Sequence, residues 1–165
     1  MKHFVLLFMM VFSLSLAAED VSLLEYGAVP NDGQNDLAAL RAAAEYCRAH
    51  PDTTLVIPPG VYDVEDAAAV KLMNDVIGGV YGNDPQSVLY QPDFPHVRIL
   101  DLTGAKNLTL RAEGATLSQQ GWYQPITLEH CDTVTLQGLT IEHKRMPFST
   151  GKIVNIASRY YDVQF

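Results

Sequence analysis

The feature that most constrains the fold of this chain is a repeat of three short segments at a nearly constant spacing. Each segment places an apolar residue on either side of a polar one, and the pairs are 100–102 with 126–128, 108–110 with 134–136, and 115–117 with 139–141. The first two pairs lie 26 residues apart and the third lies 24 apart. Alternate residues of a strand point to the same side, so such segments can stack their apolar side chains in one interior. The repeat predicts a solenoid with three strands per coil, and a β-sandwich of short strands is the alternative.

Turn signals and apolar periodicity predict further elements ahead of the repeat: a strand at 21–26, a turn at 27–35, a helix at 36–49, and two strands around a turn at 55–64. Asn35 or Asp36 can cap the helix through a side-chain oxygen, and Pro51 ends it. We expect this amphipathic helix to cover the open end of the first coil, whose interior and strand edges would otherwise be exposed.

Residues 66–95 depart from the coil pattern. The segment 66–79 contains an alanine-rich run that favours a helix, and Gly78-Gly79 would end it. The segment 81–95 reads as a long loop with three prolines. Because long loops in compact domains are often functional, we expect this segment to be a functional excursion.

The segments 25–40 and 55–62 together resemble the opening segment of secreted right-handed parallel β-helix proteins of the pectate-lyase-like superfamily. This resemblance implies an all-β fold, a single-stranded right-handed parallel β-helix with an N-terminal capping helix. It also implies a carbohydrate partner, an oligo- or polysaccharide. Because no capping segment follows the last coil, we expect a truncated solenoid.

A narrower resemblance rests on the second half of the chain. Segments 106–117 and 125–141, followed by Met146-Pro147-Phe148-Ser149-Thr150-Gly151, are similar to the α-1,3-galactosidases of glycoside hydrolase family 110. In these enzymes a β-barrel is inserted after an early coil, and 152–165, which alternates like a hairpin, looks like the start of that insertion. The resemblance implies hydrolysis of α-galactosidic linkages in glycans. It places the catalytic acids in coils beyond Phe165, so the catalytic residues are unknown.

Two other functions stay open. Galacturonidase-like hydrolases and polysaccharide lyases that degrade pectin share the opening segment, although their clustered aspartates, Gly-His-Gly motif or carboxylate-rich Ca²⁺ site do not occur in the coils of this sequence. A carbohydrate-binding β-helix without catalysis is the other alternative.

The sequence of the first eighteen residues is typical of a secretory signal peptide. Phe4 to Leu16 is almost wholly apolar, and Ala17-Ala18 offers a cleavage site before Glu19. We therefore expect a secreted or periplasmic protein that has no contact with the membrane after cleavage. The predicted organisation is a signal peptide at 1–18, a cap and first coils at 19–145, and at 146–165 the start of an inserted hairpin or barrel, or of the next coil.

The charge and the cysteines narrow the possible partners and crosslinks. Nineteen Asp and Glu residues face eleven Lys and Arg residues, which argues against nucleic acid as a partner. Cys47 and Cys131 are too few for a disulfide framework, and we expect two separate thiols.

Four residues are candidates for contacts with a sugar. Trp122 and Tyr123 could stack on the apolar face of a sugar ring, and Glu142 and His143 could contact its hydroxyl groups; packing over the solenoid edge and a solvated turn are the plainer alternatives. Glycoside hydrolysis needs two positioned carboxylates. The acids near the coils, Glu113, Glu129, Asp132 and Glu142, show no spacing that faces two of them together. We therefore expect this chain alone to be inactive, and we expect no metal and no cofactor, because the histidines lack metal-ligand spacing.

Overall fold

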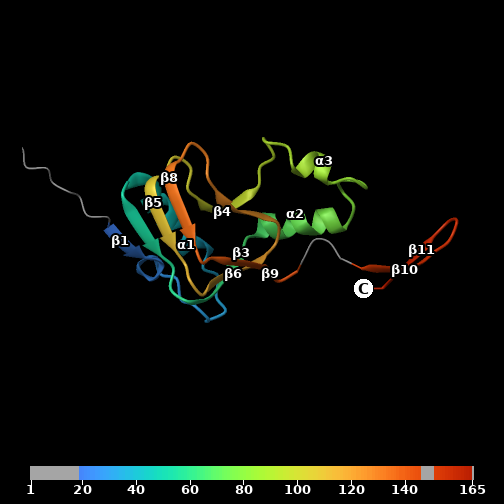
Figure 1. Ribbon diagram of the computed structural model, residues 1–165, viewed down its shortest axis with the longest axis horizontal. Coiled ribbons are helices and arrows are strands. Elements are labelled where there is room, and N and C mark those ends of the chain that lie inside the picture. The colour runs from blue at the N-terminus through green and yellow to red at the C-terminus, as the bar shows by residue number, and fades with distance from the viewer. Residues whose placement is uncertain (1–18, 146–150, 165) are drawn as a thin grey trace, which may run out of the picture.

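The computed structural model describes residues 19–145 and 151–164 (Figure 1). The predicted signal peptide at 1–18 and most of the predicted turn at 147–151 lie outside the described residues. Nine of the strands form three parallel sheets. The first sheet has the order β1-β2-β5-β8, the second β3-β6-β9, and the third β4-β7. These strands are β1 (Glu19–Ser22), β2 (Thr53–Val56), β3 (Gly60–Glu65), β4 (Val97–Asp101), β5 (Lys106–Arg111), β6 (Ala115–Gln120), β7 (Tyr123–Thr127), β8 (Asp132–Gln137) and β9 (Thr140–His143).

The chain visits the three sheets in a fixed order, so the strands form stacked, solenoid-like layers. The first layer consists of β2, β3 and β4, the second of β5, β6 and β7, and the third of β8 and β9. Residue pairing between layers follows the sequence repeat: Leu100 lies opposite Ile126, Leu108 opposite Val134, and Leu117 opposite Ile141. Both predicted spacings, 26 and 24 residues, are therefore confirmed as strand registers.

The interior consists of columns of apolar side chains that run through the layers. One column contains Leu55, Leu110 and Leu136, and another contains Tyr62, Leu117 and Ile141. The first two members of each column are fully buried, whereas Leu136 and Ile141 are 38% and 37% exposed. The core therefore lies in the first two layers.

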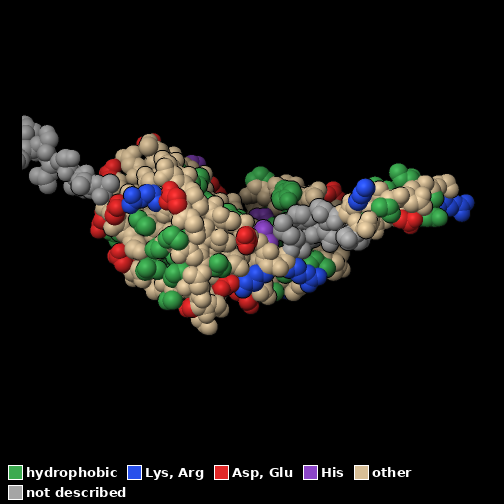
Figure 2. Space-filling model, turned by 60° about the horizontal axis from the view of Figure 1, so that its bottom comes forward, with side chains coloured by type: hydrophobic (Ala, Val, Ile, Leu, Met, Phe, Trp, Pro, Cys, Tyr) green, Lys and Arg blue, Asp and Glu red, His purple; other side chains and the backbone are tan. Residues whose placement is uncertain are grey.

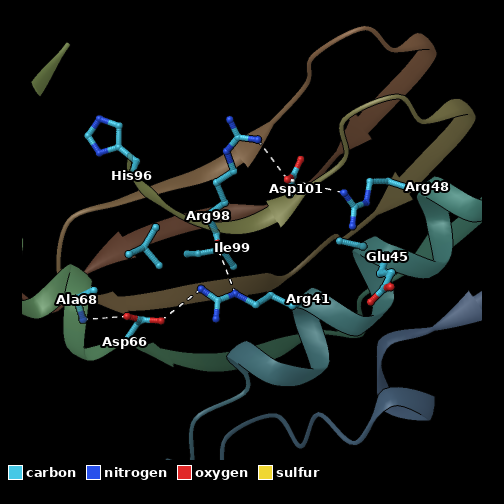
Figure 3. Close-up of a pocket in the computed structure, with 11 residues that line it drawn as sticks. Arg41, Glu45, Arg48, Asp66, Ala68, His96, Arg98, Ile99 and Asp101 are labelled. Carbon is cyan, nitrogen blue, oxygen red and sulfur yellow. Dashed lines mark hydrogen bonds and ion pairs between the residues drawn. The ribbon is translucent and has the colours of Figure 1, made fainter. Parts of the chain in front are cut away.

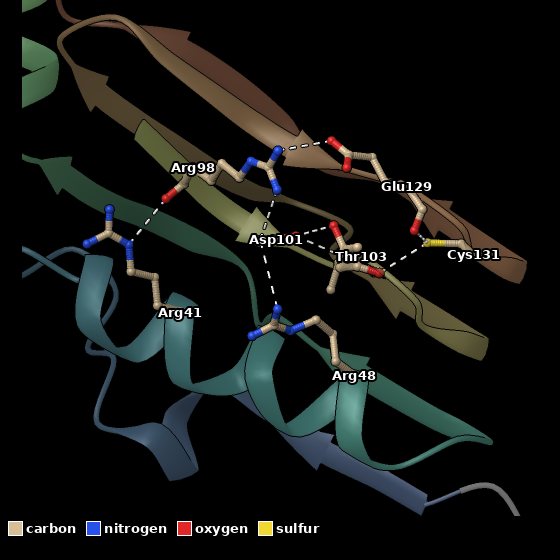
Figure 4. Close-up of polar contacts among 8 residues, drawn as sticks. Arg41, Arg48, Arg98, Asp101, Thr103, Glu129 and Cys131 are labelled. Atoms are coloured by element: carbon tan, nitrogen blue, oxygen red, sulfur yellow. Dashed lines mark hydrogen bonds and ion pairs between the residues drawn. The ribbon is translucent and has the colours of Figure 1, made fainter. Parts of the chain in front are cut away.

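Helix α1 (Leu37–Ala49) lies along the first layer. It packs mainly against β4 and against the 3-10 helix η1 (Leu23–Tyr26), and it buries Leu40, Ala43 and Cys47. Figure 4 shows it beside the strand that carries Arg98 and Asp101. The helix predicted to cover the first coil is thus confirmed.

Two details at this end differ from the sequence prediction. The predicted strand at 21–26 stops at Ser22, because Ser22 and Glu25 hydrogen-bond across the first turn of η1. The backbone N–H of Leu37 donates to Asn35 Oδ1 at 3.2 Å, while Asp36 Oδ1 accepts from the backbone of Val29 at 3.0 Å. Asp36 is therefore the N-cap residue by position, but its side chain holds the preceding loop and Asn35 accepts the hydrogen bond from the first helical N–H.

The excursion between β3 and β4 contains two helices, α2 (Ala67–Ile77) and α3 (Gln86–Leu89). The first was predicted, and Asp66 caps it by accepting from the backbone of Ala68 at 2.9 Å. The second lies within the segment predicted as a long loop. It begins after Pro85, whose fixed φ suits a helix start.

A hairpin follows the stacked layers in sequence. Its strands, β10 (Lys152–Ile156) and β11 (Tyr161–Gln164), pair antiparallel, and Asn155 donates to Asp162 at 3.0 Å across it. The predicted hairpin is confirmed. Both cysteines are free thiols, as predicted, and none of the described helices has the length and apolar character needed to cross a membrane.

Candidate functional site

A cleft of about 610 Å³ lies between the excursion and the corner that joins β6 to β7. Its lining comes from α2, α3, both sides of that corner and the end of β9, and consists of Val76, Pro85, Gln86, Tyr90, Gln119, Trp122, Tyr123, Pro125 and His143. The structure brings together three of the four predicted contact residues, Trp122, Tyr123 and His143. In Figure 2 the molecule narrows near its middle, where a histidine side chain is exposed.

The corner after β6 sets the position of the two aromatic residues. Gly121 has a φ of +127°, and a Cβ there would lie 2.7 Å from the backbone carbon of Ala69. The backbone N–H of Trp122 donates to the carbonyl of Ala69 at 3.0 Å. Only glycine allows this close approach, which fixes the corner against the first turn of α2. Trp122, half-buried, then faces the cleft.

Tyr123 differs from Trp122 in that it is almost fully buried. Its hydroxyl donates to the carbonyl of Gln120 at 3.1 Å, and burial, with Asp66 and Glu65 nearby, raises the pKa of Tyr123 to about 12. The hydroxyl is therefore uncharged at neutral pH and engaged by its own corner. Tyr123 forms the back of the cleft, which matches the packing alternative more closely than a sugar contact.

Gln119 and His143 form the polar part of the lining. They lie opposite each other in the register of β6 and β9, and Gln119 Nε2 is 2.9 Å from His143 Nε2 and 3.2 Å from its Nδ1. Gln119 is fully buried, and its Oε1 has no hydrogen-bond partner among the described residues. His143 is exposed, yet partial burial of its ring lowers the pKa of His143. The imidazole is thus neutral at pH 7.

Gln119 was missed by the sequence prediction, although the sequence contained its signal. The 24-residue offset of the third repeat pair places residue 119 directly opposite residue 143. Glu142 was predicted to act beside His143, but it lies opposite Ser118 and is exposed outside the cleft. Neighbouring residues of a strand point to opposite faces, which explains the separation.

A second hollow, a groove of about 530 Å³, lies between α1 and β4 (Figure 3). Unlike the cleft, it is lined by charged side chains that are paired with one another. Arg41 Nη2 is 3.3 Å from Asp66 Oδ2, and Arg98 reaches Asp101 at 3.2 Å and Glu129 at 3.0 Å. These ion pairs connect α1, the excursion and successive strands. The groove is therefore best explained as a structural network of ion pairs, called the clamp below.

Asp101 is the centre of this clamp (Figure 4). Its Oδ1 accepts from the hydroxyl of Thr103 at 2.6 Å and from its backbone at 3.1 Å, and Arg48 lies 3.9 Å from Oδ2. Burial by itself would raise the pKa of Asp101, but the hydrogen bonds from Thr103 and the Arg98 guanidinium hold the pKa below its ordinary value. Asp101 is thus an anion at neutral pH that pairs with Arg98 of its own strand and lies near Arg48 of α1.

Among the residues that the structure describes, no three His, Cys, Asp or Glu side chains cluster closely enough to hold a metal ion. None of the described carboxylates lines the cleft. The cleft can therefore stack an apolar ring face and form hydrogen bonds with uncharged groups.

Comparison with known proteins gives distant relatives of one kind, while no family model matches the chain. The chain is 25% identical to the α-1,3-galactosidase B of Bacteroides thetaiotaomicron over 148 residues, which cover 90% of this chain and 22% of that protein. It is 29% identical to the α-1,3-galactosidase A of Shewanella woodyi over 146 residues, 88% of this chain and 22% of that protein. An α-1,3-galactosidase A of Bacteroides fragilis is 28% identical over 127 residues, 77% of this chain and 20% of that protein.

The chain therefore spans about a fifth of the length of the curated relatives it matches. It is related at a distance to glycosidases over most of its own length, which confirms in part the resemblance drawn from the sequence.

Proposed function

We propose that this chain forms the first coils of a secreted right-handed parallel β-helix that hydrolyses α-galactosidic linkages in glycans. The observation that carries this proposal is the similarity of about nine tenths of the chain to two α-1,3-galactosidases. The parallel layers support the β-helix, and the right hand follows the strong preference of crossover connections between parallel strands. Secretion is proposed from residues 1–18, whose sequence has the organisation of a signal peptide.

The chemistry of the cleft favours a neutral sugar over the uronic acids of pectin. Its described lining residues are apolar, aromatic, amide or imidazole groups, all uncharged at neutral pH. A uronate carboxylate would lose water there without a cation to pair with, at a cost of several kcal/mol by the order-of-magnitude rule for buried charges. This argument favours the galactosidase proposal over a pectin-degrading lyase or galacturonidase.

A carbohydrate-binding role without catalysis is the second candidate for this stretch of chain. It is favoured by the same lining, which can hold a sugar ring but offers no carboxylate to act as acid or base. Under the galactosidase proposal, the cleft is an accessory subsite, because its described lining supplies neither a catalytic acid nor a catalytic base.

The test begins with export of the full chain from a bacterial host. We expect the secreted protein to start at Glu19 by N-terminal sequencing. The purified protein is then titrated calorimetrically with α-1,3-galactobiose and with digalacturonic acid, and the products are followed by chromatography. We expect binding of the galactobiose alone and no turnover. Preferential binding of the digalacturonate would contradict the proposal and support the pectin-degrading alternative.

A further inference from the structure

The carbonyl oxygen of Gln119 is a buried acceptor that the protein leaves without a donor. Gln119 has no exposed surface, and its amide nitrogen is the atom that contacts His143. The opposite atom, Oε1, is buried and has no partner among the described residues. An unpaired buried acceptor destabilises the folded chain relative to a paired one. Native proteins keep such groups where a ligand or an ordered water supplies the missing partner.

The surroundings of Gln119 show which ligand would supply that partner. Trp122 is half-buried and Tyr90 is 68% exposed, so the cleft offers two aromatic rings whose faces are not fully occupied by protein. Val76 and Pro125 add apolar surface. A ligand that matches this lining has a flat apolar face and a hydroxyl group on its edge, which describes a neutral pyranose ring.

We propose that Gln119 is the specificity-determining residue of a pyranose subsite, in which its Oε1 accepts a hydrogen bond from a sugar hydroxyl while Trp122 and Tyr90 contact the ring. This inference rests on the proposed carbohydrate partner and deepens it, because it names the atom that selects a hydroxyl donor. An acceptor oxygen discriminates against a ring that presents a carboxylate at this position, because an ionised carboxylate cannot donate and the buried oxygen would stay unpaired.

His143 lies beside Gln119 in the lining of the cleft and is itself exposed. Its ring contacts Gln119 Nε2, so the other amide atom, Oε1, stays available for a sugar hydroxyl. The amide nitrogen donates to the imidazole and the carbonyl oxygen accepts from the sugar, so both ends of the amide are paired once a sugar is bound.

The experiment compares two substitutions in the full chain, Gln119→Met and Gln137→Met. Methionine keeps the length of glutamine without its amide, and Gln137 is an exposed residue of β8 outside the cleft. Three methyl α-glycosides are titrated: galactopyranoside, glucopyranoside and galacturonide. We expect Gln119→Met to weaken binding of the preferred neutral glycoside about tenfold, the loss of one hydrogen bond. Gln137→Met should leave binding unchanged.

Two further measurements keep the test decisive. In the unmodified chain, nitrogen-15 NMR should show the side-chain amide signals of Gln119 and the indole signal of Trp122 shifting together as the sugar is added. The thermal midpoint of Gln119→Met should equal or exceed that of the unmodified chain, because the variant removes an unsatisfied acceptor. A lower midpoint with unchanged affinity would show that the protein or a water already satisfies Oε1, and it would overturn the inference.

The outcomes separate this inference from the proposed function. If the galactoside binds and Gln119→Met binds it equally well, the role of Gln119 is wrong and the galactosidase proposal stands. If only the glucoside binds, and binding depends on Gln119, the subsite is real and the galactosidic preference is wrong. If neither neutral glycoside binds, the subsite is wrong and the galactosidase proposal stands on the sequence similarity alone; if the galacturonide binds best, both are overturned.

Discussion

At one end of the stacked layers a helix covers the apolar interior, and at the other end the interior side chains meet solvent. Leu55 and Leu110 are fully buried, whereas Leu136, the next member of the same column, is 38% exposed. The three leucines occupy equivalent positions of the repeat. In this solenoid, the sequence pattern therefore determines where a side chain points, and the adjacent layer determines how well that side chain is buried.

The largest expected effect tests this difference directly. Leu110→Ala should lower the free energy of unfolding by about 3 kcal/mol, because it leaves a cavity between two layers. Leu136→Ala should lower it by about 1 kcal/mol or less, since part of that side chain is already exposed. Urea denaturation of both variants measures the two losses. Equal losses would show that the third layer is covered in solution, and the contrast between the ends would disappear.

A glycine in the third layer tests whether its backbone is as tightly packed as that of the covered layers. Gly138 has a φ of +74°, and a Cβ there would lie 2.6 Å from Glu113 Cα. Gly138→Ala should cost about 2 kcal/mol, from the left-handed backbone and the clash together. Gly104 is a matched control, with a φ of +79° and open space around its Cβ position, and its replacement by alanine should cost about 1 kcal/mol. Similar losses at both sites would mean that the third layer adjusts freely.

The smallest expected effect concerns a carboxylate at the covered end. Asp36 is 6% exposed, and its Oδ2 has no hydrogen-bond partner among the described residues. Burial raises the pKa of Asp36, and the negative charges of Asp32 and Asp63 raise it further. Two backbone hydrogen bonds lower the pKa but do not cancel the increase. The folded chain therefore holds this proton more tightly than the unfolded chain. The resulting stabilisation is complete below the unfolded-state pKa and is lost as pH rises through the folded-state pKa.

Asp36→Asn should thus remove a decline in stability with rising pH. Denaturation midpoints of both proteins between about pH 4 and pH 7 would give the two slopes. Parallel slopes would show that Asp36 has an ordinary pKa and that the covered end carries no titrating group of this kind.

Strand positions could be predicted from the sequence because the repeat has a nearly constant length. That length alone determines which residues of neighbouring strands lie opposite each other. The pairing of Leu108 with Val134 and of Leu117 with Ile141 required nothing beyond the spacing of the repeat. The hairpin at 152–164 and the helix at α2 were likewise local patterns. All of these depend on residues close in sequence or on one constant offset.

The site was less predictable because it depends on contacts that no period encodes. Trp122 and His143 were chosen for their chemistry, and the cleft that joins them exists because the excursion folds back over the β6–β7 corner. The different roles of Asn35 and Asp36 at the start of α1 depended on a loop backbone seven residues before Asp36. Gln119 was overlooked because an amide within a strand carries no signal by itself, although the 24-residue offset of the repeat already placed it opposite His143.

The excursion between β3 and β4 has a further consequence, for the order in which the layers assemble. Leu55 pairs with Leu110, 55 positions later, whereas Leu110 pairs with Leu136, only 26 positions later. Each doubling of the loop adds about 0.6 kcal/mol of closure entropy, so the second and third layers meet more readily than the first and second. A stopped-flow comparison of Leu136→Ala with Leu55→Ala should accordingly show slower folding for the first and faster unfolding for the second. We therefore expect folding to start in the part of the stack that is least protected once folded.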